Sequence, residues 1–297
     1  MRRAAHLRPV VVLGDALLDV TVRPSRVPAG GADVPATIRL ATGGQGANVA
    51  VRLARRGLAV ELHCALGDDP AGGLVRAALA ADGVRAAAVN AAATGTVVLL
   101  LAADGERTML SQRQAFAAEV TVPGDAGWVV VSGYLLAEDA GPRLAGRVAA
   151  VAARRVVLGC ALDGPAAAER WLAAARAARP ELLVLNAREA ALLASADGGP
   201  GDLAARLAGD LSATVVVTDA SGAHAATAGG ELSRAGATGG AVVDTTGAGD
   251  AVAAGMIAAL AAGDDLGSAL AAGVSLGAAV AGVDGAQGRV AGEPPLS

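Results

Sequence analysis

The chain has 297 residues and a mass of 28.6 kDa, enough for one large α/β domain with insertions or for two small domains. Its net charge of −4, with no run of basic residues, excludes the electrostatic pattern of a nucleic-acid-binding protein. All 24 basic residues are arginine. Without lysine, Walker-A phosphate binding, the protein-kinase scheme and Schiff-base chemistry are excluded. Aromatic residues make up only 1%, which predicts a closely packed core of Ala, Val and Leu.

The cysteines and the N-terminal segment indicate neither a metal site nor membrane targeting. Cys64 and Cys160 are far apart and lack paired spacing, which predicts two buried thiols. The apolar run at 10–13 is too short for the core of a signal peptide, and no apolar run reaches membrane-spanning length. We therefore expect a cytoplasmic protein that acts on small molecules, without a membrane or nucleic-acid partner.

Short runs rich in Val and Leu alternate along the chain with stretches of helical length. The runs predict buried parallel strands at 10–13, 60–65, 127–131, 155–160, 182–185 and 213–218. The stretches between them predict helices at 47–57, 70–81, 139–153, 167–178 and 202–210. This alternation predicts an α/β fold with a doubly wound, mostly parallel sheet flanked by helices, in a single domain over 1–297.

Two segments interrupt the alternation. Residues 19–41 and 95–111 are typical of extended chain with turns, and Asp104-Gly105 within the second indicates a hairpin. We expect these segments to form a small separate sheet that acts as a lid. Near the C-terminus, residues 251–283 predict two helices joined by a turn.

The strongest local motif runs from Asp244 to Asp250, with the sequence DTTGAGD. It follows a run at 241–243 that resembles a strand and opens a helix. A Gly-Ala-Gly turn into a helix N-terminus presents backbone N–H groups where the helix dipole is positive, which suits an anion. Asp250 could then deprotonate an attacking hydroxyl. The alternative is that Asp250 only caps the helix and the glycines only turn the chain.

A second motif, GGQGAN, spans residues 43–48 and precedes a helix. Its glycines permit close approach of a ligand, and the Asn48 amide suits a polyhydroxy compound. A flexible turn with a polar cap is the alternative. Asp19, which we expect just after the first strand at the carboxyl edge of the sheet, could accept hydrogen bonds from sugar hydroxyls.

Two further segments permit a structural and a functional interpretation. Asn186 and Glu189 have the spacing of a capping box. From the spacing alone, this structural role is favoured over a role in binding. Thr218 and the Ser221-Gly222 turn end a predicted strand, where backbone could meet a nucleotide. A dinucleotide fingerprint fails because position 252 is Val, and the three histidines form no hydrolase triad.

Together, the motifs at 43–48 and 244–250 resemble the two signatures of the ribokinase-like (PfkB-type) carbohydrate kinases. Gly67-Asp68-Asp69, Thr94-Gly95-Thr96 and the segments at 186–189 and 218–222 also fall where that family places related segments, so the resemblance covers nearly the whole chain. Gln45 departs from the family because ribokinases usually carry Lys there, and Arg113-Gln114-Ala115-Phe116 replaces a frequent Arg-Gly-Ala-Asn-like stretch.

The resemblance implies a role for each motif residue. The implied catalytic residues are Asp250 as base, with Gly247, Ala248 and Gly249 as anion hole. The implied substrate residues are Asp19, Gly43, Gly44, Gln45 and Asn48. The implied nucleotide residues are Asn186, Glu189, Thr218 and Gly222, with Glu189 helping to hold Mg²⁺ through water. The implied ligands of a monovalent cation such as K⁺ are Asp244, Thr246 and Gly285.

From the resemblance we expect transfer of the ATP γ-phosphoryl group, with Mg²⁺, to a primary hydroxyl of a sugar or sugar-like substrate. The lid is expected to allow a homodimer. One alternative is a nucleoside kinase of the same fold, for which Phe116 is the candidate base-stacking residue. The other is a ligand-binding regulator without turnover, although the Gly-Ala-Gly-Asp turn is intact.

Overall fold

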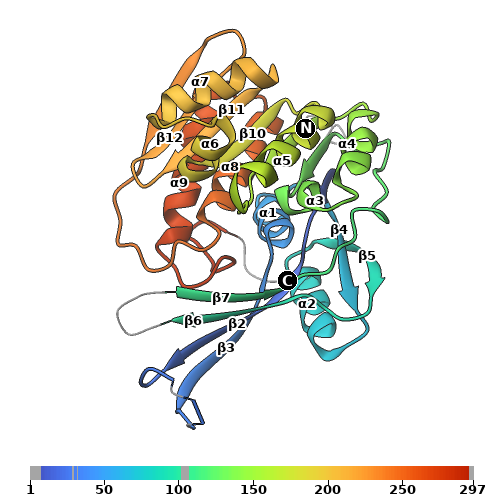
Figure 1. Ribbon diagram of the computed structural model, residues 1–297, viewed down its shortest axis with the longest axis vertical. Coiled ribbons are helices and arrows are strands. Elements are labelled where there is room, and N and C mark those ends of the chain that lie inside the picture. The colour runs from blue at the N-terminus through green and yellow to red at the C-terminus, as the bar shows by residue number, and fades with distance from the viewer. Residues whose placement is uncertain (1–7, 29, 32, 102–106, 294–297) are drawn as a thin grey trace, which may run out of the picture.

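The computed structural model of the chain describes residues 8–28, 30–31, 33–101 and 107–293 (Figure 1). Within these residues, a nine-stranded sheet forms the centre of the molecule. Its strands are β1 (Val10–Leu13), β4 (Val60–Gly67), β5 (Arg85–Ala91), β8 (Trp128–Val131), β9 (Arg154–Leu158), β10 (Leu182–Asn186), β11 (Thr214–Asp219), β12 (Gly222–Ala226) and β13 (Leu232–Gly236). They lie in the order β13-β12-β11-β10-β9-β8-β1-β4-β5. The strands from β11 to β5 are parallel, and β12 and β13 add an antiparallel edge.

Helices cover both faces of this sheet. One face carries α1 (Gln45–Ala54), α2 (Pro70–Ala81), α8 (Ala248–Ala262) and α9 (Leu266–Ala281). The other carries α3 (Gly133–Ala137), α4 (Gly141–Ala149), α5 (Gly164–Ala178), α6 (Ala187–Ala194) and α7 (Pro200–Leu211). Along β1, Val10 and Val12 pack on the first side and Val11 and Leu13 on the second. Because both faces are covered, the central strands are continuous apolar runs, and the predicted doubly wound fold is confirmed.

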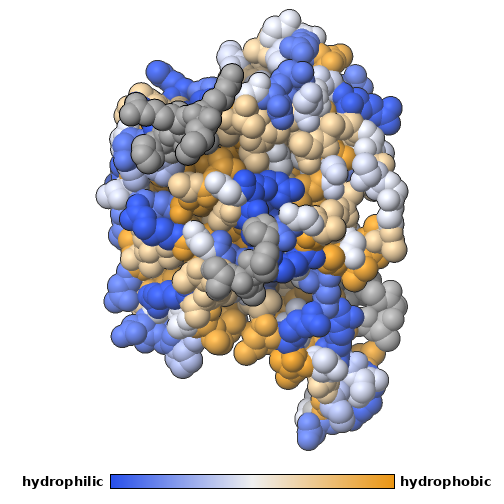
Figure 2. Space-filling view, turned by 180° about the vertical axis from the view of Figure 1, so that it is seen from behind, coloured by the Kyte–Doolittle hydropathy of each residue, from blue (hydrophilic) through white to orange (hydrophobic). Residues whose placement is uncertain are grey.

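A second sheet of four strands projects from one end of the molecule (Figures 1 and 2). Its strands are β3 (Ala36–Gly43), β2 (Leu17–Pro24), β6 (Thr96–Leu101) and β7 (Arg107–Gln112), in that spatial order. They come from the two segments predicted to be extended. The predicted Asp104-Gly105 turn lies outside the described residues.

Other predictions need correction. The strand-like run at 241–243 is irregular chain, with Val242 and Val243 exposed by 69% and 60%. Its apolar composition imitates a strand, but β13 already forms that edge of the sheet. The helix predicted at 139–153 is shorter, ending at Ala149, and the strands β5, β12 and β13 were not predicted. Ala-rich strands such as β12 have no β-branched signal to mark them.

The fold brings strand ends and helix starts together at one edge. The parallel strands β1, β8, β9, β10 and β11 all end there, which is the edge where open α/β sheets bind ligands. The N-termini of α1, α6 and α8 reach the same edge. No helix in the described ranges is both long and apolar enough to span a membrane.

Candidate active site

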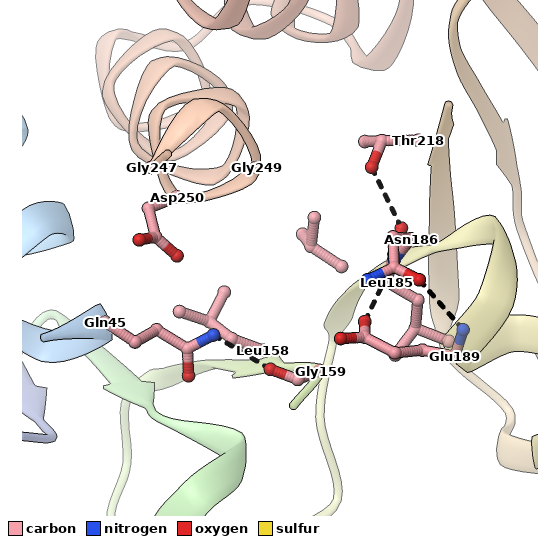
Figure 3. Close-up of a pocket in the computed structure, with 11 residues that line it drawn as sticks. Gln45, Leu158, Gly159, Leu185, Asn186, Glu189, Thr218, Gly247, Gly249 and Asp250 are labelled. Carbon is pink, nitrogen blue, oxygen red and sulfur yellow. Dashed lines mark hydrogen bonds between the residues drawn. The ribbon is translucent and has the colours of Figure 1, made fainter. Parts of the chain in front are cut away.

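A cleft of about 140 Å³ lies at this edge of the large sheet (Figure 3). The Asp250 side chain points into it from the start of α8, and Asn186 and Glu189 face it from the start of α6. The residues that line the cleft are Gln45, Leu158, Gly159, Val184, Leu185, Asn186, Glu189, Thr218, Gly247, Gly249 and Asp250. Residues from both sequence motifs are therefore brought together with residues from three strand ends.

The start of α8 has the geometry of an anion site. Gly247 is the N-cap with φ 76°, and a Cβ there would lie 2.7 Å from the Cβ of Ala286. Gly249 has no atom within 4 Å of a built Cβ, so its backbone is open to the cleft. The Ala248 N–H already donates to the Thr245 carbonyl at 3.2 Å. The remaining first-turn N–H groups, those of Gly249 and Asp250, have no acceptor within the helix and can meet a ligand.

The surroundings of Asp250 raise the pKa of its carboxyl group. Its carboxylate accepts a hydrogen bond of 2.8 Å from Asn48 Nδ2. Burial raises the pKa of Asp250 to about 7, and the charges of Asp15 and Glu189 add to the rise. Hydrogen bonds from Asn48 and Gln45 oppose it. A carboxyl group with such a pKa is suited to general base catalysis.

Glycines allow α1 to approach two aspartates. Gly44 has φ 96°, and a Cβ there would lie 2.6 Å from the Asp15 carbonyl. A Cβ at Gly43 would collide with the Asp19 carboxylate. Burial raises the pKa of Asp19 to about 6, Asp15 adds to the rise, and Arg113 opposes it. The predicted position of Asp19 is corrected: it lies within β2 of the small sheet, and Asp15, two residues after the end of β1, is the aspartate at that strand end.

Asp15 is the centre of a cluster that the sequence did not reveal as a site. It is 8% exposed and forms an ion pair with Arg113. The Arg113 guanidinium stacks 4.0 Å from the ring centroid of Tyr134. Asp15 could have been found from its place directly after the apolar run and Gly14, at the carboxyl end of the first strand.

The Gln45 amide links two strand ends at the cleft. Its Nε2 donates to the Gly159 carbonyl at 2.8 Å, and its Oε1 accepts from Ser132 Oγ at 2.7 Å and from the Gly133 N–H at 3.0 Å. It therefore ties together the ends of β8 and β9 at the cleft. No lysine or arginine side chain lines this cleft in the described part of the chain.

The capping box predicted at the start of α6 is confirmed. The Glu189 N–H donates to Asn186 Oδ1 at 2.9 Å, and the Asn186 N–H donates to Glu189 Oε2 at 3.0 Å. Burial raises the pKa of Glu189. Both side chains also line the cleft, so the cap and the site share residues.

Thr218 and Gly222 differ in their relation to the cleft. Thr218 lines it and donates from Oγ1 to the Leu185 carbonyl at 3.3 Å. Gly222 is not among the lining residues; its φ is 132°, and a Cβ there would collide with the Ala235 carbonyl. Close approach of β12 to β13 therefore explains this glycine without a ligand. Asp219 accepts hydrogen bonds from the N–H and hydroxyl of Ser221, which lower its pKa.

The three residues named for a monovalent cation lie together. One oxygen of the Asp244 carboxylate accepts from Thr246 N at 2.9 Å and from Thr246 Oγ1 at 2.6 Å. The other accepts from the Gly285 N–H at 3.2 Å. These contacts hold the loop before α8 against the loop after α9, where backbone oxygens could face a cation.

The arrangement of the strand ends, the two glycine turns and Asp250 can be compared with known proteins. The sequence from residue 8 to residue 291 matches the model of the family described as pfkB family carbohydrate kinase. The chain belongs to this family. As a family member it is a phosphotransferase with a hydroxyl group as acceptor. No curated protein sequence matches the chain.

Solved structures of this family have the same fold. Ribokinase from Thermotoga maritima is similar with a TM-score of 0.77 and 17% identity, covering 95% of each chain. Ribokinase from Cryptococcus neoformans var. grubii serotype A, in complex with ADP, has a TM-score of 0.75 and 23% identity, also covering 95% of each. The nucleoside kinase from Methanocaldococcus jannaschii has a TM-score of 0.77 and 19% identity, covering 96% of this chain and 95% of its own.

The residues at the cleft fit a hydrated Mg²⁺ ion. Mg²⁺ keeps several waters and is usually bound through one or two carboxylates together with substrate phosphates. Glu189 supplies a carboxylate and Asn186 an amide oxygen at the wall of the cleft, facing the start of α8. Among the described residues, no group of three or more His, Cys, Asp or Glu side chains is placed to hold a metal directly.

Phe116, the candidate base-stacking residue of the nucleoside alternative, is buried. It is 4% exposed and belongs to the core on this side of the sheet, and Glu138 accepts a hydrogen bond of 3.0 Å from its N–H. It lies in the loop after β7 and outside the small sheet. Phe116 is therefore not a lid residue, and its stacking on a base stays a prediction.

Proposed function

We propose that this pfkB-family enzyme transfers the γ-phosphoryl group of ATP to a primary hydroxyl of a sugar or sugar-like acceptor, with Asp250 as the base. One observation carries the proposal. The Asp250 carboxylate, with a pKa of about 7, lies beside the open N–H groups of α8 and faces Asn186 and Glu189 across one cleft. A proton acceptor and an anion site therefore flank the same space.

In this mechanism the acceptor lies on the side of Asp19, Gly43, Gly44 and Asn48, with its hydroxyl against Asp250. Asp19 accepts hydrogen bonds from the other hydroxyls. Gln45, the remaining substrate residue of this motif, also holds the end of β9 in place through its amide. Asp250 takes the proton as the hydroxyl oxygen attacks in line, and holding the reactants together lowers the entropic cost of the step.

The nucleotide lies on the side of Asn186, Glu189 and Thr218, with Gly222 farther along the same edge. Negative charge that develops on the transferred group is stabilised by the turn of Gly247, Ala248 and Gly249, where the open backbone donors are the N–H groups of Gly249 and Asp250. Glu189 would hold Mg²⁺ through water, and Mg²⁺ would neutralise phosphate charge. Asp244, Thr246 and Gly285 would hold K⁺ next to α8. We place the enzyme in the cytoplasm, where ATP is available.

In this proposal the chain is a single kinase domain, and the small sheet is its lid. The same sheet is the surface through which two copies form a homodimer. Alternate residues of its strands share one face, where Val20 pairs with Leu40 and Val98 with Leu110. On that face, Ile38, Leu40 and Leu110 are exposed by 63%, 55% and 57%. An apolar sheet face of this kind is stabilised when a second copy covers it.

The test is ADP formation from Mg²⁺-ATP with a panel of pentoses, hexoses and nucleosides, with and without K⁺. ADP formation that depends on a sugar supports the proposal and names the acceptor class. Formation with nucleosides alone would establish the nucleoside kinase instead. No formation with any acceptor would contradict the proposed reaction.

A further inference from the structure

A chain of side-chain amides connects the loop after α9 to Asp250. Gln287 Nε2 donates to Asn48 Oδ1 at 3.1 Å, and Asn48 Nδ2 donates to Asp250 Oδ2 at 2.8 Å. Asn48 is 6% exposed, so few water molecules can replace these partners. Gln287 belongs to neither sequence motif.

The direction of these hydrogen bonds depends on Gln287. An asparagine amide has one acceptor end and one donor end, and rotation by half a turn exchanges them. In the rotated form, Asn48 Oδ1 would face the Asp250 carboxylate, and two acceptors would repel. A donor at Gln287 favours the form in which Asn48 donates to Asp250.

The backbone around Gln287 is fixed by buried arginines of α1. Arg55 Nη1 donates to the Gln287 carbonyl at 2.8 Å, and Arg52 Nη2 donates to the carbonyls of Ala286 and Gly288 at 2.7 and 2.8 Å. Arg52 also pairs with Glu293 at 2.8 Å, and the two side chains are 1% and 2% exposed. The arginine contacts to residues 286–288 use only main-chain oxygens, so a change of the Gln287 side chain leaves them intact.

We propose that Gln287 is a positioning residue for phosphoryl transfer, which acts by holding the Asn48 amide so that it donates to Asp250. The inference rests on the proposed function, in which Asp250 is the base. The ionisable groups that face Asp250 are Asp15, after β1, and Glu189, on α6, and both disfavour its ionised form. The Asn48 donor opposes them, so its orientation affects the pH at which Asp250 becomes a base.

Two variants separate orientation from simple loss of contact. In Gln287→Leu the pKa of Asp250 should rise, so the fall in kcat on the acid side (the acid limb of the profile) should begin about half to one pH unit higher than in wild type. This is the size of shift expected for one weakened hydrogen bond. The plateau above pH 9 should stay within about threefold, because Asp250 is ionised there in both proteins. In Gln287→Glu the carboxylate only accepts, so it competes with Asp250 for the Asn48 donor. We expect this variant to lose about tenfold or more on the plateau itself.

The experiment is the pH dependence of kcat, with KM for ATP and the thermal midpoint, for wild type, Gln287→Leu, Gln287→Glu and Gln112→Leu. Gln112 is exposed on β7 and gives the same chemical change away from the cleft. A limb that shifts in Gln287→Leu but not in Gln112→Leu, together with a lowered plateau in Gln287→Glu, supports the inference. An unshifted limb in Gln287→Leu, or a wild-type plateau in Gln287→Glu, would overturn it. If Asp250→Asn keeps wild-type turnover, the proposed function itself fails, which is a distinct result.

Discussion

The side chains of Asn48 and Asp250 are joined by a hydrogen bond of 2.8 Å, although 202 positions separate them in the sequence. Each residue lies in the first turn of a helix, α1 or α8, and each helix follows a glycine-rich turn. The two motifs that stand out in the sequence are thus two halves of one site. Their meeting point is the group that we propose as the base.

The pKa of Asp250 predicts the pH dependence of the reaction. Its ionised form accepts the proton, and the raised pKa means that this form dominates only above about pH 7. We expect kcat to be constant at higher pH and to fall about tenfold per unit below pH 7. Initial rates between pH 5.5 and pH 9 check this. A profile that stays flat down to pH 5.5 would contradict the assignment.

Asp19 should control acceptor affinity. Asp19→Asn removes the charge that accepts hydroxyl donors, so KM for the acceptor should rise about tenfold or more while KM for ATP stays within about twofold. Because the pKa of Asp19 is about 6, the wild-type acceptor KM should also rise below that pH. Steady-state kinetics with each substrate varied give both values. Asp33→Asn, at an exposed aspartate between β2 and β3, is the control and should match wild type.

Much of the fold could be predicted because it depends on local patterns. The strands β1, β8, β10 and β11 are apolar runs covered on both faces, and such runs are visible without any tertiary information. The capping box of α6 was predicted from two residues at fixed spacing. The glycine turns at α1 and α8 were visible for the same reason.

The rest depends on contacts between distant segments. Asp15 and Arg113 pair across 98 positions, and no spacing rule connects them. Gln287 contacts Asn48 across 239 positions, in a loop that Arg52 and Arg55 hold against α1. At 241–243 the local pattern instead predicted too much structure. The composition of this run resembles a strand, but no partner strand is left to pair with it.

Arg52 should be important for stability because its charge is buried. Arg52→Ala removes the cation at 2.8 Å from the buried Glu293 carboxylate, which keeps the longer ion pair with Arg55 at 3.2 Å, and leaves two loop carbonyls without the Arg52 donor. We expect a loss of about 3 kcal/mol in the free energy of unfolding, measured by urea denaturation. Arg143→Ala, at an exposed position of α4, should change it by less than about 0.5 kcal/mol. Equal effects of the two variants would refute the account of the buried pair.

The small sheet should determine the oligomeric state. A Leu40→Lys change places a charge in the middle of the exposed apolar face, so the proposed dimer should dissociate. Ser111→Lys puts the same charge on the opposite face of β7 and should leave the dimer intact. Molar mass from light scattering after size-exclusion chromatography distinguishes the two. The dimer proposal does not survive if Leu40→Lys and wild type have the same mass.

The central claim is that Asp250 is the base, and the most direct test compares wild type with Asp250→Asn at pH 8. The measured quantity is the initial rate of ADP formation with the best acceptor, together with the Kd of ATP and the thermal midpoint. We expect a fall in kcat of about a thousandfold, an ATP Kd within about threefold, and a thermal midpoint at least as high as that of wild type, since a buried charge has been removed. A variant that turns over at close to the wild-type rate would contradict the mechanism.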